Sequence, residues 1–179
     1  QGFQQPLNCI LRHPGRLVRD AFLRKGDALV EAYHALAASY DRLTGDVDYA
    51  AVVDFYLQIL NKEGCHPSTA VDLACGTGSV TLLLAKMGMQ VTGVDLSEDM
   101  LTVACQKAQE QGLNPVFTCQ ALQALRLPRG VDLAVCALDS LDYILDPEDC
   151  REAIARAFRV LNPGGIFIFD VNTPEKLRA

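Results

Sequence analysis

The chain has 179 residues, half of them hydrophobic, and carries a formal net charge of −6 at pH 7. This length and composition suffice for one domain with a core of its own. The acidic balance disfavours an extended nucleic-acid interface, because phosphate contacts depend on clustered Lys and Arg. No apolar run is long enough to cross a bilayer or to form the core of a signal peptide, which favours a cytoplasmic protein.

Residues 1–26 differ in composition from the rest of the chain. They are rich in Arg and are interrupted by prolines, whereas apolar residues recur at helical spacing from residue 29 onward. We therefore expect an N-terminal extension over 1–26 and a single domain over 27–179. Asp27 is expected to cap a first helix that ends near Gly45.

The stretch 70–79 predicts a buried strand that runs into a glycine loop and opens a helix. Its first five residues, Ala-Val-Asp-Leu-Ala, are almost continuously apolar, as in a central parallel strand covered on both faces. Asp72 interrupts the run, and a buried carboxylate is costly unless it is paired or lies at the strand's end, so it indicates a polar site there. Gly76 and Gly78 permit a tight turn and the close approach of a ligand. The helix that follows directs its free amides to the same edge.

Strands and helices alternate through the rest of the chain. Four further strands are expected at 90–95, 115–119, 131–137 and 166–170, the last after an Asn-Pro-Gly-Gly turn. Helices are expected to begin after the capping residues Asp48, Ser97 and Asp146. This alternation predicts an α/β fold with right-handed crossovers: a Rossmann-like, doubly wound, mostly parallel sheet with helices on both faces.

The seven cysteines show neither a Cys-x-x-Cys pair nor the spacing of a metal site, so no metal is expected. Buried, reduced side chains are the expected state of most of them. Cys75 is the exception, because its loop should leave it near a ligand.

Asp95 ends the second strand, at a place suited to the two hydroxyls of a ribose lying across the first strand. Asp72-Leu-Ala-Cys-Gly-Thr-Gly78, followed by Val-Thr-Gly-Val-Asp95-Leu-Ser97, resembles motif I and its successor in the class I S-adenosylmethionine-dependent methyltransferases. Other segments resemble bacterial small-molecule members of this class: Tyr40-Asp41, 46–49, 139–143 and 161–172. The resemblance runs from about residue 33 to the end of the chain.

This resemblance implies S-adenosylmethionine as the cofactor and the strand order 3-2-1-4-5. It implies contacts to the cofactor from Tyr40, Asp72, Ala74, Cys75, Gly76, Thr77, Gly78, Asp95, Leu96, Met100, Ala121, Leu122 and Leu138. Asp72 would receive the ammonium group of the donor, and Met100 would touch the adenine. The chain departs from the family at Ala121, where an acid for the adenine amino group is expected, which leaves backbone groups of Ala121 and Leu122 to contact the ring.

Candidate catalytic residues are few, because methyl transfer is an in-line displacement that needs no covalent nucleophile. Asp139 and Asp142 can orient or deprotonate an acceptor, or attract a cationic amine. Alternatively, one of them, Asp142 above all, caps the short helix after the fourth strand. His34 is the histidine best placed to act as a base if one is used, and a plain surface position is its alternative.

We predict methyl transfer to a small-molecule acceptor, with neither nucleic acid nor membrane as a partner. One alternative is an S-adenosylmethionine-binding homologue or partner subunit without turnover. Another is an NAD-dependent oxidoreductase, which Thr81 disfavours because a dinucleotide fingerprint has a third small residue there.

The fifth strand is the last that the sequence accounts for, whereas the resembled family adds two more. We therefore expect the domain at 27–179 to be incomplete at its C-terminal end and to show little methyl transfer alone. The strand 166–170 would then be an edge rich in Ile and Phe, through which the chain could self-associate.

Overall fold

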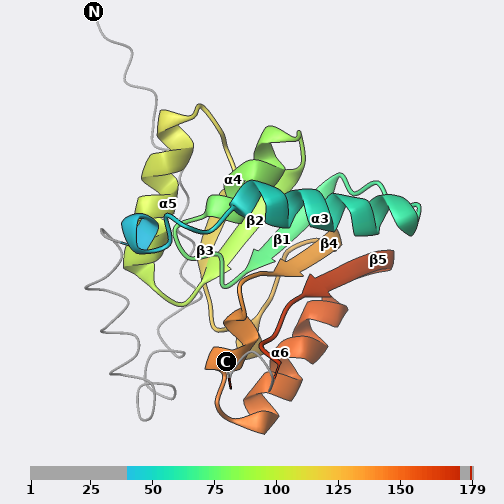
Figure 1. Ribbon diagram of the computed structural model, residues 1–179. Helices are drawn as coiled ribbons and strands as arrows, with labels where there is room; N and C mark the ends of the chain where they lie inside the picture. Colours follow the sequence, from blue (N-terminus) through green and yellow to red (C-terminus); the bar gives the residue numbers. More distant parts are fainter. Residues whose placement is uncertain (1–39, 174–177, 179) are drawn as a thin grey trace, which may run out of the picture.

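The computed structural model describes residues 40–173 and 178 (Figure 1). In chain order its elements are α3 (Tyr49–Lys62), β1 (Thr69–Leu73), α4 (Ser79–Lys86), β2 (Gln90–Asp95), α5 (Glu98–Glu110), β3 (Val116–Cys119), η1 (Leu122–Ala124), β4 (Val131–Cys136), η2 (Ser140–Tyr143), α6 (Pro147–Arg159) and β5 (Leu161–Phe169). The extension 1–26 and most of the first expected helix lie outside the described residues. Its described part, residues 40–43, is helical.

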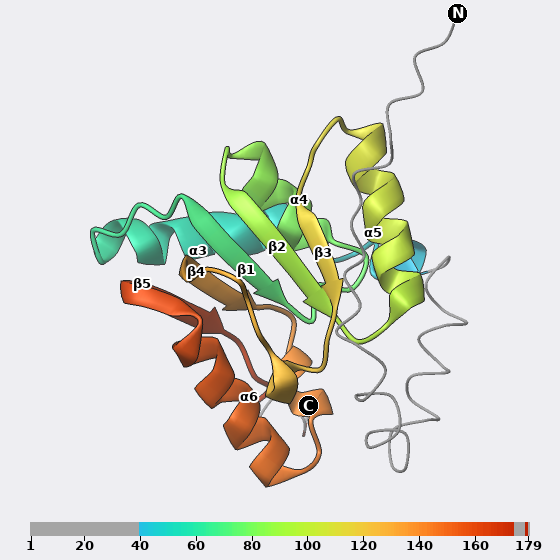
Figure 2. The ribbon, with the colours of Figure 1, turned by 180° about the vertical axis from the view of Figure 1, so that it is seen from behind.

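The five strands of the described residues form one parallel sheet in the order β3-β2-β1-β4-β5, which confirms the expected fold class and strand order. The chain moves outward from β1 to β2 and β3 and then returns to the other side of β1 with β4. This reversal leaves a crevice at the carboxyl ends of β1 and β4, where open α/β sheets bind ligands. Figures 1 and 2 show both faces of the twisted sheet.

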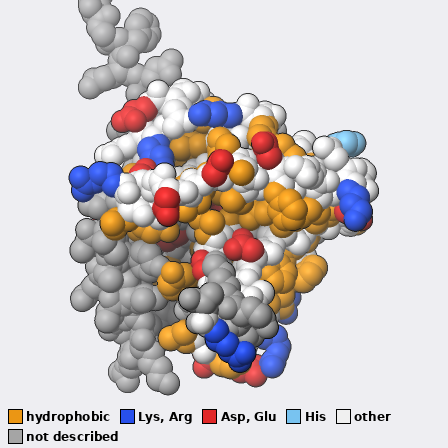
Figure 3. All heavy atoms as spheres, viewed as in Figure 1, with side chains coloured by type: hydrophobic (Ala, Val, Ile, Leu, Met, Phe, Trp, Pro, Cys, Tyr) orange, Lys and Arg blue, Asp and Glu red, His pale blue; other side chains and the backbone are white. Residues whose placement is uncertain are grey.

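Helices cover both faces of the sheet (Figures 1 and 2). On one face, α3 and α4 pack on Ala70 and Leu133, among others. On the other face, Val71 and Leu73 belong to the core cluster that contains α6 residues. Because side chains alternate along a strand, Asp72 points to the same face as Ala70, toward α4. Figure 3 shows a band of hydrophobic side chains across the side of the molecule that carries α3.

The expected helix caps are confirmed by short-range hydrogen bonds. Asp48 accepts a bond from the Ala51 amide at 2.9 Å, and Ser97 accepts one from the Met100 amide at 3.3 Å. The Asp146 carboxylate accepts bonds from two amides in the first turn of α6. Each cap satisfies a backbone donor that the helix leaves free.

Strand β5 begins earlier than expected, at Leu161 instead of residue 166. The Asn-Pro-Gly-Gly segment is therefore part of the strand, and the pairing with β4 is irregular between Val131 and Leu133. A side chain on Gly165 would come within 3.0 Å of the Asp132 carbonyl oxygen, so glycine permits this close passage. Among the described strands β5 is an edge, and Phe169 on it is 44% exposed.

Asp132 joins three strands at the opposite, amino-terminal edge of the sheet. Its Oδ2 accepts bonds from the Ser68 amide at 3.0 Å and from the Thr69 amide and hydroxyl at 3.1 and 2.9 Å. Its Oδ1 accepts a bond from Asn162 Nδ2 on β5 at 2.8 Å. These donors hold the pKa of Asp132 well below its usual value.

Replacing Asp132 with Ala is expected to lower the free energy of unfolding by about 2 kcal/mol at pH 7, because several hydrogen bonds to a charged group are lost. The depressed pKa sets the sign of the pH effect: the stabilisation is complete above the unfolded pKa near 3.8 and declines as the pH falls below it. Urea unfolding at pH 7 and pH 3 measures both effects. Asp54→Ala, on the exposed surface of α3, is the control and should change stability by less than about 0.5 kcal/mol. Equal losses for the two variants would contradict this role of Asp132.

The cysteines follow the expectation only in part. Cys65, Cys75, Cys119, Cys136 and Cys150 are free, as expected for reduced residues, but the expected burial holds only for Cys136 among these five, and Cys65, Cys119 and Cys150 are half-buried. Cys105 is disulfide-bonded, so the expectation is wrong for this residue. In the part of the chain that the structure describes, no helix is both long and apolar enough to cross a membrane.

Candidate functional site

A pocket lies at the carboxyl ends of β1 and β4, next to the glycine loop. Residues from four segments line it: Tyr40, Tyr49, Asp72, Ala74, Cys75, Gly76, Thr77, Ser79, Val80, Ala137, Leu138 and Ser140. The pocket thus brings together seven of the residues expected to contact the cofactor: Tyr40, Asp72, Ala74, Cys75, Gly76, Thr77 and Leu138. It forms at the topological switch point of the sheet, where ligand sites of this fold class occur.

The backbone is strained on both sides of this pocket. Among the described residues, three that are not glycine have positive φ angles: Ala74 at 56°, Leu138 at 57° and Asp139 at 50°. Ala74 follows β1, and the other two follow β4. Such conformations cost on the order of 1–3 kcal/mol each and cluster at ligand sites. This strain marks the same edge of the sheet as the pocket does.

Asp72 is a buried carboxylate with one hydrogen-bonding side chain next to it. It is 2% exposed, and its Oδ2 accepts a bond of 2.6 Å from the hydroxyl of Thr81 on α4, which is fully buried. Burial raises the pKa of Asp72 to about 7, although the bonds from Thr81 act in the opposite direction. Thr81, which departs from the dinucleotide fingerprint, is therefore the residue that holds Asp72 in place.

Asp95 supports the glycine loop from the end of β2. Its Oδ2 accepts a bond from the Gly76 amide at 2.8 Å, and its Oδ1 accepts one from the Ser97 amide at 2.9 Å. Burial raises the pKa of Asp95, and the backbone donors oppose that rise. Each carboxylate oxygen can accept a second bond, so this arrangement leaves capacity for a ligand.

The two glycines of the loop have different surroundings. Gly76 has φ +53°, and a Cβ there would meet no atom within 4 Å. Gly78 has φ +79°, and a Cβ there would lie 3.0 Å from the Cβ of Ala104 on α5. Gly76 therefore faces open space where a ligand can approach, whereas Gly78 allows the close packing of α4 and α5.

We expect Gly76→Ala and Gly78→Ala to separate these two roles. Gly78→Ala should lower the free energy of unfolding by about 1–3 kcal/mol, because it adds a steric conflict to a strained φ angle. Gly76→Ala should cost only about 1–2 kcal/mol of stability, from strain alone, but should weaken ligand binding. Urea unfolding and calorimetry with S-adenosylhomocysteine measure the two properties. Full affinity in the Gly76→Ala variant would show that the loop is only a turn.

Asp139 and Asp142 both contact the segment that follows β5. Asp142 Oδ2 accepts a bond from the Asn172 amide at 2.9 Å, and the Asp139 carboxylate accepts one from the Asn172 side chain. Asp170 in turn accepts bonds from the amides of Leu138 and Asp139 at 2.9 and 2.7 Å. Neither Asp139 nor Asp142 caps η2 through its side chain, so the capping alternative is wrong. The carboxylates accept hydrogen bonds from Asn172 instead, because the chain passes beside them after β5.

Comparison with known proteins identifies the family. Residues 70–165 match the family model described as a methyltransferase domain. The structure is similar to the crystal structure of an S-adenosylmethionine-dependent methyltransferase from Clostridium acetobutylicum ATCC 824, with a TM-score of 0.73 and 37% sequence identity, covering 82% of this chain and 60% of that one. The chain belongs to the class I S-adenosylmethionine-dependent methyltransferases. The alternative of an NAD-dependent oxidoreductase is therefore wrong.

Two relatives show how much of the family's length this methyltransferase chain covers. A protein of Geobacillus sp. (strain WCH70) is 34% identical over 146 residues, which are 81% of this chain and 59% of the relative. The ubiquinone biosynthesis O-methyltransferase of Idiomarina loihiensis (strain ATCC BAA-735 / DSM 15497 / L2-TR) is 36% identical over 111 residues. These residues are 61% of this chain and 44% of that relative. The chain thus spans about three fifths of the Geobacillus relative.

The remaining expected cofactor residues of the methyltransferase lie outside the pocket lining. Met100, Ala121 and Leu122 are buried, and Leu96 is 48% exposed. Gly78 and Asp95 support the loop, as described above. The roles of these residues in cofactor binding stay predictions. His34 lies outside the described residues, so its role as a base stays a prediction too.

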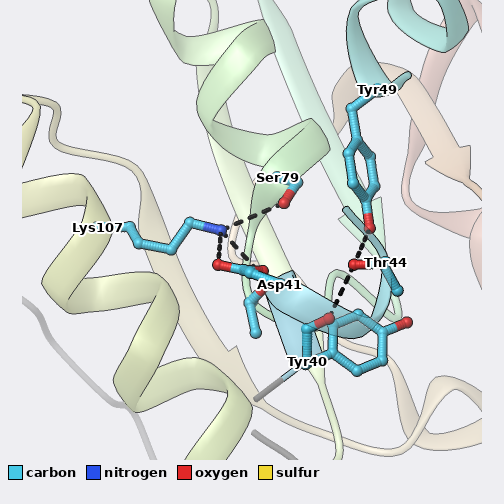
Figure 4. A network of polar contacts seen from close by, with 7 residues as sticks. Tyr40, Asp41, Thr44, Tyr49, Ser79 and Lys107 are labelled. Carbon is cyan, nitrogen blue, oxygen red and sulfur yellow. Dashed lines mark hydrogen bonds and ion pairs between the residues drawn. The ribbon is translucent and has the colours of Figure 1, made fainter. Parts of the chain in front are cut away.

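A polar network of the methyltransferase includes residues to which the sequence assigned no role (Figure 4). Asp41 lies in the short helical segment 40–43, and Lys107 lies in the last turn of α5. The two form an ion pair of 2.8 Å beside the glycine loop. Asp41 was visible as part of the Tyr40-Asp41 motif, but nothing in the sequence pointed to Lys107, which is 66 residues away.

Proposed function

We propose that this chain binds S-adenosylmethionine at the carboxyl ends of β1, β2 and β4 and serves methyl transfer to a small-molecule acceptor. The observation that carries the proposal is the pair of carboxylates beside the glycine loop, buried Asp72 and half-buried Asp95, with open space beside Gly76. When bound, S-adenosylmethionine supplies a sulfonium methyl group that an acceptor atom can displace in line.

The residues of the pocket suit the parts of this donor. Asp72 lines the pocket and, when ionised, offers a negative charge to an ammonium group. Asp95 lies one strand away with accepting capacity for ribose hydroxyls. Tyr40 and Tyr49 contribute aromatic surface to the lining of the pocket. The chain therefore contributes binding and orientation, which is the main requirement of an in-line displacement.

A small-molecule acceptor is supported by similarity. A ubiquinone biosynthesis O-methyltransferase is among the relatives, and it shares 36% identity over the matched region. Asp139 and Asp142 lie beside the pocket residues Leu138 and Ser140 and would orient an acceptor through their ordered carboxylates. The cytoplasmic location and self-association through the edge of β5 stay predictions, the second of which light scattering tests.

The test of the proposal is binding followed by turnover. Calorimetry should detect S-adenosylhomocysteine and S-adenosylmethionine binding to this chain, while NAD at the same concentrations gives no signal. Radiolabelled S-adenosylmethionine with panels of phenols, amines and carboxylic acids then tests for transfer. Absence of S-adenosylhomocysteine binding to the folded chain would overturn the proposal. Binding without transfer is the result expected of an incomplete domain, and the same result with a chain extended beyond residue 179 would support the alternative of a binding homologue.

A further inference from the structure

Side chains from three distant segments meet at the rim of the pocket (Figure 4). Lys107 Nζ on α5 lies 2.8 Å from Asp41 Oδ2 and donates to Ser79 Oγ at 3.2 Å. Thr77 Oγ1, in the glycine loop, donates to Asp41 Oδ1 at 2.5 Å. Asp41 is thus bound to the loop through one oxygen and to α5 through the other. We call Asp41, Thr77 and Lys107 the clasp.

The clasp has more hydrogen-bond partners than an isolated surface ion pair. An isolated exposed pair contributes little, because solvent screens it and two long side chains lose freedom. Here the Asp41 side chain is 45% exposed, but the Lys107 side chain is 22% exposed and Thr77 is only 2% exposed. Asp41 also accepts a hydrogen bond from Thr77 in the glycine loop, and Lys107 donates one to Ser79 at the start of α4. The geometry of Asp41 is therefore held by several groups at once.

The position of Tyr40 depends on the residues on either side of it. Tyr40 precedes Asp41 and lines the pocket, and burial raises the pKa of its hydroxyl. Its carbonyl oxygen accepts a bond of 3.0 Å from the Thr44 hydroxyl, which in turn accepts one of 3.2 Å from the Tyr49 hydroxyl. The Thr44 contacts are local in sequence, whereas the clasp connects residues 36 and 66 positions apart. The clasp is thus a long-range connection of this segment to the glycine loop and α5.

We propose that the ion pair of Asp41 and Lys107 holds Tyr40 against the donor pocket and thereby slows the release of the bound donor. The inference rests on the proposed function, because it assumes that the pocket binds S-adenosylmethionine. Neither Asp41 nor Lys107 lines the pocket, so both are positioning residues that act through Tyr40 and Thr77. An interaction that only retains a bound ligand changes the dissociation rate more than the association rate.

The test compares the dissociation rate of S-adenosylhomocysteine, measured by surface plasmon resonance, in the wild-type chain and in Lys107→Met. We expect release roughly tenfold faster in the variant, with an association rate that changes less than about threefold. Lys62→Met is the matched control. Lys62 also lies in the last turn of a helix, so its replacement removes the same interaction with the helix dipole. It should leave both rates unchanged.

Three further measurements distinguish positioning from general destabilisation. Lys107→Arg should restore slow release, since Arg keeps the charge. Asp41→Asn should accelerate release to a similar degree, and the double variant Asp41→Asn with Lys107→Met should be no faster than either single variant. Raising the salt concentration should accelerate release from the wild type and have less effect on Lys107→Met.

The outcomes separate the inference from the proposed function. If the wild-type chain binds no S-adenosylhomocysteine, the proposed function fails. If it binds, and Lys107→Met releases the ligand as slowly as the wild type, the clasp does not retain the donor and the inference is wrong. The inference is also wrong if Lys107→Arg releases the ligand as fast as Lys107→Met does. It is likewise wrong if the double variant releases the ligand faster than either single variant.

Discussion

Replacing Asp95 with Ala is expected to raise the dissociation constant for S-adenosylhomocysteine by roughly tenfold to a few hundredfold. Hydrogen bonds between a ligand hydroxyl and a carboxylate are worth about 1.5–3 kcal/mol each. The Asp95 carboxylate also accepts bonds from the Gly76 and Ser97 amides, so its removal deprives the glycine loop of its support. Both effects act in the same direction, and calorimetry measures their sum.

A second variant separates the two contributions of Asp95. Asp95→Asn keeps an oxygen that can accept a bond from the loop but removes the negative charge. Its free energy of unfolding, measured without ligand, should lie closer to that of the wild type than the value for Asp95→Ala. Its affinity should still fall severalfold. A folded Asp95→Ala variant with an unchanged dissociation constant would remove Asp95 from the ribose site.

Replacing Asp72 with Asn should have opposite effects on stability and on binding. At pH 8 the folded wild-type chain must carry an ionised carboxylate in its interior, where burial has raised the pKa from 3.8 to about 7. Asn has the same shape and can accept the Thr81 hydroxyl bond without a charge. We therefore expect the free energy of unfolding at pH 8 to increase by roughly 2–4 kcal/mol. Affinity for S-adenosylhomocysteine should fall roughly tenfold or more, because its ammonium group loses an ionic partner.

The pH dependence of the wild type follows from the same pKa shift. Between about pH 4 and pH 7 the unfolded chain releases the Asp72 proton while the folded chain retains it, so this group lowers stability as the pH rises through that window. Donor affinity should change in the other direction and decrease as the pH falls below about 7, since the protonated group no longer attracts an ammonium ion.

Thermal unfolding and calorimetry at pH 5 and pH 8 test this pair of predictions. The stability difference between Asp72→Asn and the wild type should be large at pH 8 and small at pH 5. Thr81→Val is a useful companion, because it removes the hydroxyl that holds Asp72 and should lower both stability and affinity. A loss of stability in Asp72→Asn at pH 8, or unchanged affinity, would contradict the role of Asp72.

The sequence by itself determined the helices and strands and the parallel direction of the strands in the sheet. Asp48, Ser97 and Asp146 were identifiable as caps because a capping side chain bonds to amides two or three residues ahead. The glycine loop was identifiable for a similar reason, since positive φ angles depend on the local chain. Signals of this kind are contained within a few consecutive residues.

The tertiary structure decided which side chains meet. Thr81 reaches Asp72 because α4 packs on the face of β1 to which Asp72 points. Asn172 reaches Asp139 and Asp142 because β5 pairs with β4 and ends beside the loop that follows it. Lys107 reaches Asp41 because α5 packs beside the glycine loop and the start of α4. These partners lie between 9 and 66 residues apart, so no local sequence pattern could reveal them. Burial and hydrogen bonding in the folded chain determine the pKa values of the carboxylates and the positions of these side chains.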